Sequence, residues 1–411
     1  MLTLDRKRAL DHVVGRPALK TLNLLTRTLG WILRRNHRVD PVGTILIMKF
    51  QGMGSLALAY PAISALRLEY PKARLLFWGT PATCALARLI PDFDEILVLN
   101  DSTALNAAFS LLRTLPRLWS LKIDWGFDFE VYSKLSAILL TLTCARNRAG
   151  FAVDTIASRK DCHTHLVMFN RYQYLGRAYA RLVGLVLRQN KAIDLSAAPR
   201  WKEAPRLPAA LERLDYVVFN PNVGELAPER AWPVESFCAA ITQFFSTHPQ
   251  HHVVLTGKGP AEKAVSAGIP RHPRLVDLTD QLTLPELIGT LGGAQAVVTG
   301  DTSALHLALL TDAPVVALFG PTLPATYFPS ERPRTKALFQ GIYCSPCIHH
   351  WHYPPCRGNN QCMKSITAGD VIEALLQVMK SNQTLTAHST YSIESTEYYP
   401  GLIYDKDRKG G

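Results

Sequence analysis

The chain contains 411 residues, of which 47% are hydrophobic and 19% are charged. This composition is typical of a globular protein and excludes a disordered one, and the length allows two domains with full cores. The formal charge is +12, from 45 basic and 33 acidic residues. No apolar run approaches the roughly 18 residues that a membrane-spanning helix requires, and the amino terminus shows no clear signal-peptide pattern.

The amino-terminal segment, residues 1–40, carries half of the positive excess, since nine Lys or Arg face three Asp. From Pro17 onward its sequence predicts a helix with one apolar face and one mainly basic face. The apolar face contains Leu22, Leu25, Leu29, Ile32 and Leu33, with Trp31 at its edge, and the other contains Arg16, Lys20, Asn23, Arg27 and Arg34. We interpret residues 1–40 as an extension that lies on an anionic membrane surface. A helix packed on the protein's own core is the alternative.

The first half of the chain alternates strand-like and helical segments. The strands are predicted at residues 44–48, 74–78, 95–99 and 125–129, and helices at 57–70 and 81–89. Such alternation predicts a mainly parallel sheet with flanking helices, so the fold class is α/β. We place this first domain at residues 41–205.

A Pro-rich, charged segment, residues 199–208, reads as a linker to a second α/β domain at residues 206–380. Its strands are predicted at 216–219, 252–255, 296–299 and 315–319, and its helices at 234–245, 284–291 and 304–310. The tail, residues 381–411, is polar and without periodicity, and we expect it to be poorly ordered.

The turn after Gly300 is the most informative segment. Asp301, Thr302 and Ser303 offer three N-cap oxygens between a short strand and a helix that contains His306. A helix that begins at the carboxyl end of a strand favours an anion such as phosphate. An ordinary capped helix is the alternative.

These residues also carry a resemblance. Asp301-Thr-Ser-Ala-Leu-His306, followed by Ala317-Leu-Phe-Gly-Pro-Thr322, resembles the donor-site signature of glycosyltransferase family 9, the heptosyltransferases of lipopolysaccharide assembly. Residues 45–61, residues 219–224 and Arg230-Ala-Trp-Pro233 resemble further motifs of that family, in the same order. The likeness extends from about residue 43 to about residue 380.

The resemblance implies the GT-B fold, in which two Rossmann-like domains with mainly parallel sheets face a central cleft. It also implies an inverting, metal-independent glycosyltransferase. Such an enzyme moves a sugar such as heptose from a nucleotide diphosphate donor to a membrane glycolipid or a cell-surface polysaccharide precursor. The expected location is cytoplasmic, peripheral on the inner face of the cytoplasmic membrane. No cofactor is expected for catalysis, and no nucleic acid is expected as a partner.

On the donor side, the resemblance places Arg230 at the basic position of the family's Lys/Arg-x-Trp-Pro motif. A fixed guanidinium there neutralises a diphosphate without a metal. The turn of Gly257 and Lys258 is expected near the nucleoside. Asp301, Thr302, Ser303 and His306 complete the predicted donor-binding set, with Ser303 replacing a glycine of the family pattern.

On the catalytic side, the family carries an Asp after the glycine of the first turn, where this chain has Ser55. A hydroxyl does not act as a base unaided, so we predict that Glu130, at the Gln position of the family's Asp-x-Gln-Gly, replaces it. Lys134 lies one helical turn away. Lys49, Gly52 and Gly54 are expected on the side of the transferred sugar and the acceptor. A solvated or salt-bridged Glu130 is the alternative.

Three competing interpretations remain. Gly52-Met-Gly-Ser-Leu-Ala57 loosely matches a dinucleotide fingerprint, which would indicate an oxidoreductase, although the second predicted strand ends without the acid that holds a ribose. Asp92-Phe-Asp94 could be a metal-binding Asp-x-Asp, but we favour ordinary scaffold. A sugar-nucleotide binding or scaffold protein without turnover is the alternative from another class.

The eight cysteines form two sets. Cys84, Cys144, Cys162 and Cys238 are isolated, as core cysteines usually are. The others, Cys344, Cys347, Cys356 and Cys362, form Cys-x2-Cys-x8-Cys-x5-Cys, with His349, His350 and His352 inside the motif. Four thiols at this spacing indicate a structural zinc site or an iron–sulfur cluster, and free thiols are the alternative.

Overall fold

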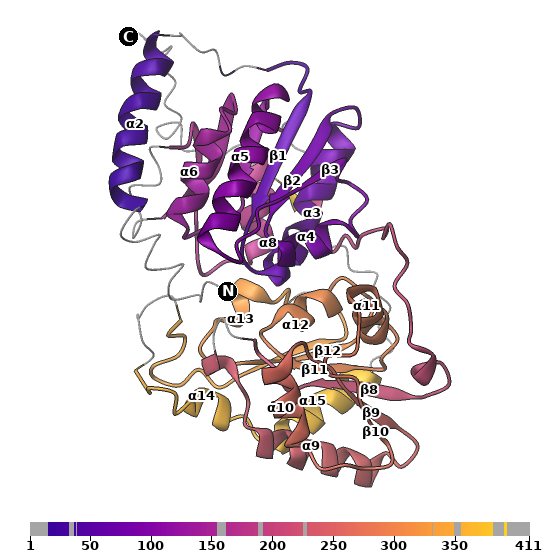
Figure 1. The fold of residues 1–411 in the computed structure, drawn as a ribbon. Helices are drawn as coiled ribbons and strands as arrows, with labels where there is room; N and C mark the ends of the chain where they lie inside the picture. Colours follow the sequence, from indigo (N-terminus) through magenta and orange to yellow (C-terminus); the bar gives the residue numbers. More distant parts are fainter. Residues whose placement is uncertain are drawn as a thin grey trace. The chain divides into compact units, whose positions relative to one another are not determined.

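The computed structural model describes residues 15–32, 37, 39–153, 162–187, 192–224, 228–330, 332–348, 355–380 and 390–392. They divide into two compact units (Figure 1). The first contains the described residues of Met1–Arg171, Gly176–Lys202 and Thr390–Gly411, and the second those of Tyr172–Leu175 and Glu203–Ser389. One passage of the chain from the first unit to the second lies between Lys202 and Glu203, inside the Pro-rich segment 199–208.

The first unit is built on a six-stranded sheet with the order β3-β2-β1-β4-β5-β6 and parallel pairing throughout. Its strands are β1 (Thr44–Lys49), β2 (Arg74–Gly79), β3 (Glu95–Val98), β4 (Trp125–Asp128), β5 (Asn147–Ala152) and β6 (His165–Met168). The predicted parallel sheet is therefore confirmed. The sequence did not predict β5 and β6.

Helices cover both faces of this sheet. They are α2 (Gly15–Ile32), α3 (Met53–Glu69), α4 (Pro81–Ala87), α5 (Ala104–Ser120), α6 (Lys134–Leu142) and α8 (Leu175–Gly184). Leu46 and Met48 of β1 pack in one cluster with Leu118 of α5 and Leu139 of α6. Phe77, on the other face of the sheet, contacts Phe93. Hence α5 and α6 cover one face and α3 and α4 the other (Figure 1).

The second unit repeats the plan, with the strand order β10-β9-β8-β11-β12-β13 and parallel pairing. Its strands are β8 (Tyr216–Asn220), β9 (His252–Leu255), β10 (Leu275–Asp277), β11 (Val297–Gly300), β12 (Val315–Phe319) and β13 (Thr335–Phe339). Its α-helices are α9 (Val234–Thr247), α10 (Pro260–Ala267), α11 (Leu284–Gly292), α12 (Ser303–Ala308), α13 (Pro324–Tyr327), α14 (Gln361–Lys364) and α15 (Ala368–Lys380). Short 3-10 turns occur at Ala209–Leu211 and Pro228–Arg230.

The cores follow from this arrangement. Every residue of β8 and of β12 is buried, as expected for parallel strands that are covered on both faces. In each sheet the strand order reverses beside the first strand, between β1 and β4 and again between β8 and β11. Ligands of such sheets bind beyond the carboxyl ends of the strands at this reversal. The topology alone therefore points to two positions for functional residues.

Part of the carboxyl-terminal tail forms a strand. A short strand, β14 (Thr390–Ser392), lies in the tail that the composition predicted to be poorly ordered, and it pairs antiparallel with β7 (Ala192–Asp194). The rest of residues 381–411 lies outside the described residues. Within the described chain, none of the helices combines the length and the apolar character needed to cross a bilayer.

Candidate active site

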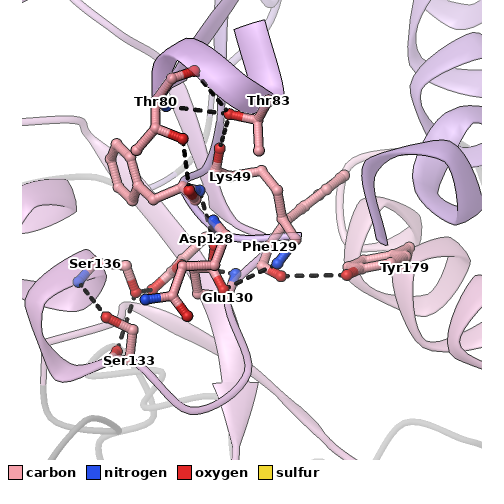
Figure 2. A network of polar contacts seen from close by, with 11 residues as sticks. Lys49, Thr80, Thr83, Asp128, Phe129, Glu130, Ser133, Ser136 and Tyr179 are labelled. Carbon is pink, nitrogen blue, oxygen red and sulfur yellow. Dashed lines mark hydrogen bonds and ion pairs between the residues drawn. The ribbon is translucent and has the colours of Figure 1, made fainter. Parts of the chain in front are cut away.

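A buried ion pair lies at the strand reversal of the first unit. Met48 of β1 is the register partner of Asp128 of β4, so the residues that follow, Lys49 and Glu130, emerge side by side at the carboxyl edge. Lys49 Nζ donates to Glu130 Oε2 over 2.9 Å, and the two side chains are only 6% and 8% exposed (Figure 2). Charges this deeply buried are tolerated only when each has a partner.

The second oxygen of Glu130 holds the chain that follows β1. Glu130 Oε1 accepts the backbone N–H groups of Phe50 at 2.7 Å and Gln51 at 2.8 Å. Two threonines hold the same backbone through its carbonyls. Thr83 Oγ1 donates to the carbonyl of Lys49, and Thr80 Oγ1 donates to that of Phe50, each over 2.8 Å (Figure 2). The segment between β1 and α3 is thus fixed from both sides.

The glycine-rich turn depends on this support. Gly52 has a φ of 74°, in the left-handed region, and its carbonyl accepts the N–H of Ser55 at 3.1 Å. A Cβ added at Gly52 would lie 2.8 Å from Ser55 Oγ, so this hydroxyl lies against the glycine. Ser55 is half-buried and Gly54 is buried, both in the first turn of α3.

Asp128 forms a second polar cluster beside the pair. Its Oδ1 accepts the N–H of Glu130 at 3.0 Å, and its Oδ2 accepts the hydroxyl of Ser136 at 2.8 Å (Figure 2). His163 Nε2 lies 3.4 Å from the same Oδ2, and both side chains are fully buried. Lys134, the first residue of α6, is buried as well.

The second unit places a comparable cluster at its own reversal. Asp301 follows β11, which pairs with β8 so that Thr299 is opposite Asn220. Arg230 donates to the backbone carbonyl of Asp301, and its guanidinium lies 3.4 Å from Asp301 Oδ2. On the other side, His306 Nε2 lies 3.4 Å from Asp301 Oδ1. Arg230, Asp301 and His306 thus meet at one strand end, and their role in binding the donor stays a prediction.

The charge state of Asp301 follows from these neighbours. Its side chain is 3% exposed, and burial by itself would raise its pKa. The hydrogen bond from His306, the charge of Arg230 and the neighbouring Thr322 outweigh burial and hold the pKa of Asp301 below its ordinary value. Asp301 is therefore a carboxylate that fixes the position of a guanidinium.

Of the three N-cap candidates that the sequence offers for α12, one caps the helix. Thr302 Oγ1 accepts the N–H of Ala304 at 3.2 Å and is the cap. Asn220, at the end of β8, donates to the hydroxyl of Thr302 over 3.4 Å. Ser303 is the half-buried first residue of α12. Asp301 instead binds the guanidinium.

The turn of Gly257 reaches the end of β8 in a different way. A Cβ at Gly257 would lie 2.3 Å from Asn222 Nδ2, so only glycine allows the approach. Lys258, by contrast, is 77% exposed and pairs with Asp280 at 3.2 Å. A surface pair of this kind is weak. Lys258 is held less firmly than Arg230.

Trp232 supports the Arg230 segment from behind. Its indole is 3% exposed, and Nε1 donates to the carbonyl of Ile366 over 2.9 Å. Phe237 contacts the ring edge-on, with centroids 4.6 Å apart. Two residues from Arg230, the chain is therefore joined to the segment that precedes α15.

The cysteine motif is described only in part. Cys347 and Cys362 are buried, Cys344 and Cys356 are half-buried, and all four are free thiols. Burial and the neighbouring thiols of Cys362, Cys344 and Cys356 raise the pKa of Cys347 to about 11. Across the described ranges, no group of three or more His, Cys, Asp or Glu side chains is arranged to hold a metal ion. His349 and His350 lie outside those ranges, as does His352.

This motif packs on the turn after β12. A Cβ at Gly320 would lie 2.8 Å from Cys362 Sγ and 2.5 Å from Met363 Sδ. The N–H of Cys347 donates to the carbonyl of Pro321 over 3.0 Å. The cysteine segment therefore contacts the Gly-Pro-Thr sequence that resembles the donor signature.

The model of glycosyltransferase family 9 (heptosyltransferase) matches residues 133–353, which is more than half of the chain. The chain belongs to this family. It is accordingly a glycosyltransferase of the heptosyltransferase type, and the interpretation as an oxidoreductase was wrong.

Similar proteins agree with this assignment. Lipooligosaccharide heptosyltransferase 2 of Campylobacter jejuni serotype O:6 is 22% identical over 337 residues, which cover 79% of this chain and 95% of that protein. A family 9 glycosyltransferase from Veillonella parvula has a TM-score of 0.65 at 16% identity and covers 84% of this chain and 99% of its own. E. coli ADP-heptose lps heptosyltransferase II has a TM-score of 0.62 at 16% identity, with coverage of 82% and 98%. The predicted GT-B fold, with two Rossmann-like domains, is confirmed.

Other polar residues of this glycosyltransferase have evident structural partners. Asp94 accepts the N–H of Leu75 at 2.7 Å and pairs with Arg67 at 2.6 Å. Burial raises the pKa of Asp92. The contacts of Asp94 agree with our interpretation of Asp92-Phe-Asp94 as scaffold. The contact of His163 with Asp128 was missed, since no sequence motif connects them.

The buried pair of the first unit leads to a prediction. We expect Lys49→Met to destabilise the protein by about 3–5 kcal/mol, because it leaves the Glu130 carboxylate buried beside an apolar side chain. Adding Glu130→Gln to Lys49→Met should restore part of this loss. Urea unfolding followed by circular dichroism measures the effect.

The matched control is Arg74→Met, which breaks a partly exposed pair with Glu95 and should cost less than about 1 kcal/mol. Equal midpoints for Lys49→Met and Arg74→Met would contradict the structural importance of the buried pair.

Proposed function

We propose that this family 9 glycosyltransferase is an inverting enzyme that needs no metal ion for catalysis. It moves a sugar such as heptose from a nucleotide diphosphate to a hydroxyl of a membrane glycolipid or cell-surface polysaccharide precursor. The observation that carries the proposal is the contact of Arg230 with Asp301 at the strand reversal of the second unit. The names of the similar proteins, an ADP-heptose lps heptosyltransferase and a lipooligosaccharide heptosyltransferase, support the choice of sugar and acceptor.

Arg230 is suited to a diphosphate for two physical reasons. Its side chain is 15% exposed, so water screens its charge less than that of a surface arginine. Asp301 and its carbonyl hold the planar group in one orientation, which reduces the entropy lost when an anion binds. A cation fixed in this way stabilises the negative charge that collects on the departing diphosphate.

The transfer also needs a base for the acceptor. In the proposed reaction, the acceptor oxygen attacks the anomeric carbon as the bond to the diphosphate breaks, and a carboxylate takes the hydroxyl proton. We propose Glu130 for this role. Both of its oxygens accept hydrogen bonds in the structure, so the acceptor hydroxyl must replace or share one of them. If Glu130 only positions the glycine-rich turn, the base is another group, of which Asp128 is the nearest in sequence.

Membrane attachment through residues 1–40 is the remaining part of the proposal. The apolar side chains described in α2 lie in two environments, one packed on the protein and one exposed. Leu19 is fully buried against Ala137 and Cys162, and Leu22 packs at the margin of the same cluster. Leu25 is 52% exposed and remains available to a membrane. The sequence alternative of a helix packed on the protein therefore accounts for one side of α2. We propose a peripheral location on the cytoplasmic face of the membrane.

The proposed donor site leads to a prediction about nucleotide binding. Arg230→Ala should weaken the binding of a nucleotide diphosphate such as ADP by about 1.5–3 kcal/mol, through the loss of a charge-assisted contact. Isothermal titration calorimetry measures the affinity. Arg271→Ala removes an exposed arginine of the same unit and should leave it unchanged. Wild-type affinity in the Arg230 variant would remove this residue from the site.

The proposed catalytic base, Glu130, leads to a prediction about turnover. Glu130→Gln should lower the turnover of sugar transfer at least about a hundredfold with nearly unchanged donor affinity, while Ser55→Ala has a mild effect. The assay follows ADP-heptose-dependent mass increase of an extracted lipopolysaccharide precursor. Donor binding without transfer by the wild type would favour the scaffold alternative. A Glu130 variant that is folded and nearly normal in turnover would return the search to Asp128.

The cysteine motif leads to a prediction about metal content. We propose that its four thiols hold a structural zinc ion or an iron–sulfur cluster, on the support of their spacing and of the two buried members. Elemental analysis of the purified protein should find the metal, and the double variant Cys344→Ser/Cys356→Ser should lose it. Cys144→Ser, which alters an exposed isolated cysteine, is the control. A metal-free protein with four reactive thiols in this motif would establish the free-thiol alternative.

A further inference from the structure

Helix α5 exposes a row of large apolar side chains. Leu105 is 83% exposed, Phe109 54%, Leu112 73% and Trp119 51%. Their spacings of four, three and seven residues place them on one side of the helix. Soluble proteins seldom expose adjacent apolar groups of this size without a binding partner.

The folding of α5 does not require this row. Leu118 is fully buried in the cluster that contains Leu46 and Leu139, and Leu111 and Leu115 pack against the same cluster. One part of the apolar side of α5 therefore completes the core, and the adjoining part is left in solvent.

Two more helices extend this surface. Trp119 Nε1 donates to the carbonyl of Leu142, which joins the end of α5 to the end of α6. On the other side of α6, α2 packs through Leu19, and the three helices follow one another in Figure 1. Leu24 of α2 is 70% exposed. We refer to the outer surface of these helices as the α2–α6–α5 face.

The charged residues of α2, α5 and α6 are all basic. Together their sequences contain six Lys or Arg and no Asp or Glu. Arg113 lies over the ring of Phe109 at 4.1 Å, so a cation accompanies the apolar row. Arg117 is paired with Glu95 of β3, and Lys134 is buried. Arg113, whose side chain is exposed, adds a positive charge that is complementary to an anionic surface.

We propose that the α2–α6–α5 face docks on a bilayer of anionic phospholipid, with the row of α5 inserted among the headgroups. An exposed indole beside leucines and basic residues is typical of a membrane interface. A second copy of the chain fits less well, because two such faces would bring like charges together. The inference rests on the proposed membrane acceptor, and it extends the predicted contact from residues 1–40 to α5.

The test uses the full chain and vesicles of phosphatidylglycerol and phosphatidylethanolamine, with pure phosphatidylcholine for comparison. The double variant Leu105→Ser/Leu112→Ser should partition onto the anionic vesicles at least about tenfold more weakly than the wild type. It should keep the wild-type melting temperature, because both side chains are exposed. Leu68→Ser is the matched control, since Leu68 is 71% exposed on α3, which covers the opposite face of the sheet.

Three results would overturn the proposal. They are wild-type partitioning of the double variant, an equal loss in Leu68→Ser, and failure of the wild type to prefer anionic vesicles. Sedimentation velocity without lipid adds a fourth, since a wild-type oligomer that the double variant dissociates would identify a second copy as the occupant. Binding is measured without donor or acceptor, so an enzyme that transfers no sugar can still pass this test.

Discussion

All strands of a parallel sheet end at the same edge, and at the point where the strand order reverses the neighbouring connections leave in opposite directions. This chain builds that edge twice, beside β1 and beside β8. At each reversal, a carboxylate that follows the fourth strand meets a cation from the end of the first strand or from the chain after it. Glu130 meets Lys49 in the first unit, and Asp301 meets Arg230 in the second. The strand order determines where both pairs lie. The residue types in each pair determine what it can bind.

Buried ion pairs of this kind are costly to desolvate and contribute more to geometry than to net stability. In the first unit, the carboxylate holds backbone amides, so the pair determines where the glycine-rich turn lies. In the second, the carboxylate holds a guanidinium, so the pair determines where a positive charge lies. In the reaction that we propose, the first pair shapes the backbone beside the sugar and the second fixes a positive charge beside the leaving group.

Much of the fold could be predicted because many of the strands are continuous apolar runs. The strands β5 and β6 could not, since Asn147, Arg148 and His165 interrupt the pattern. Helix α5 was also missed, because Pro116 lies inside it and a proline usually interrupts a helical pattern. The residues that we predict to bind the donor stand out through family motifs, whereas the bond between Lys49 and Glu130 joins residues that are 81 positions apart and needs the strand register. Thiol spacing, likewise, does not determine whether a metal is bound.

The bond from Trp232 to Ile366 spans 134 positions of the chain. Recognisable donor motifs end at Thr322, so a gene fragment could encode all of them and still lack the carbonyl that anchors the indole. In such a fragment Arg230 would still be present in the sequence. The hydrogen bond that holds the neighbouring Trp232 in place would be lost. Surveys of genomes that count family motifs therefore need to ask whether the last helix is encoded, because a motif-complete but truncated relative is not equivalent to an intact enzyme.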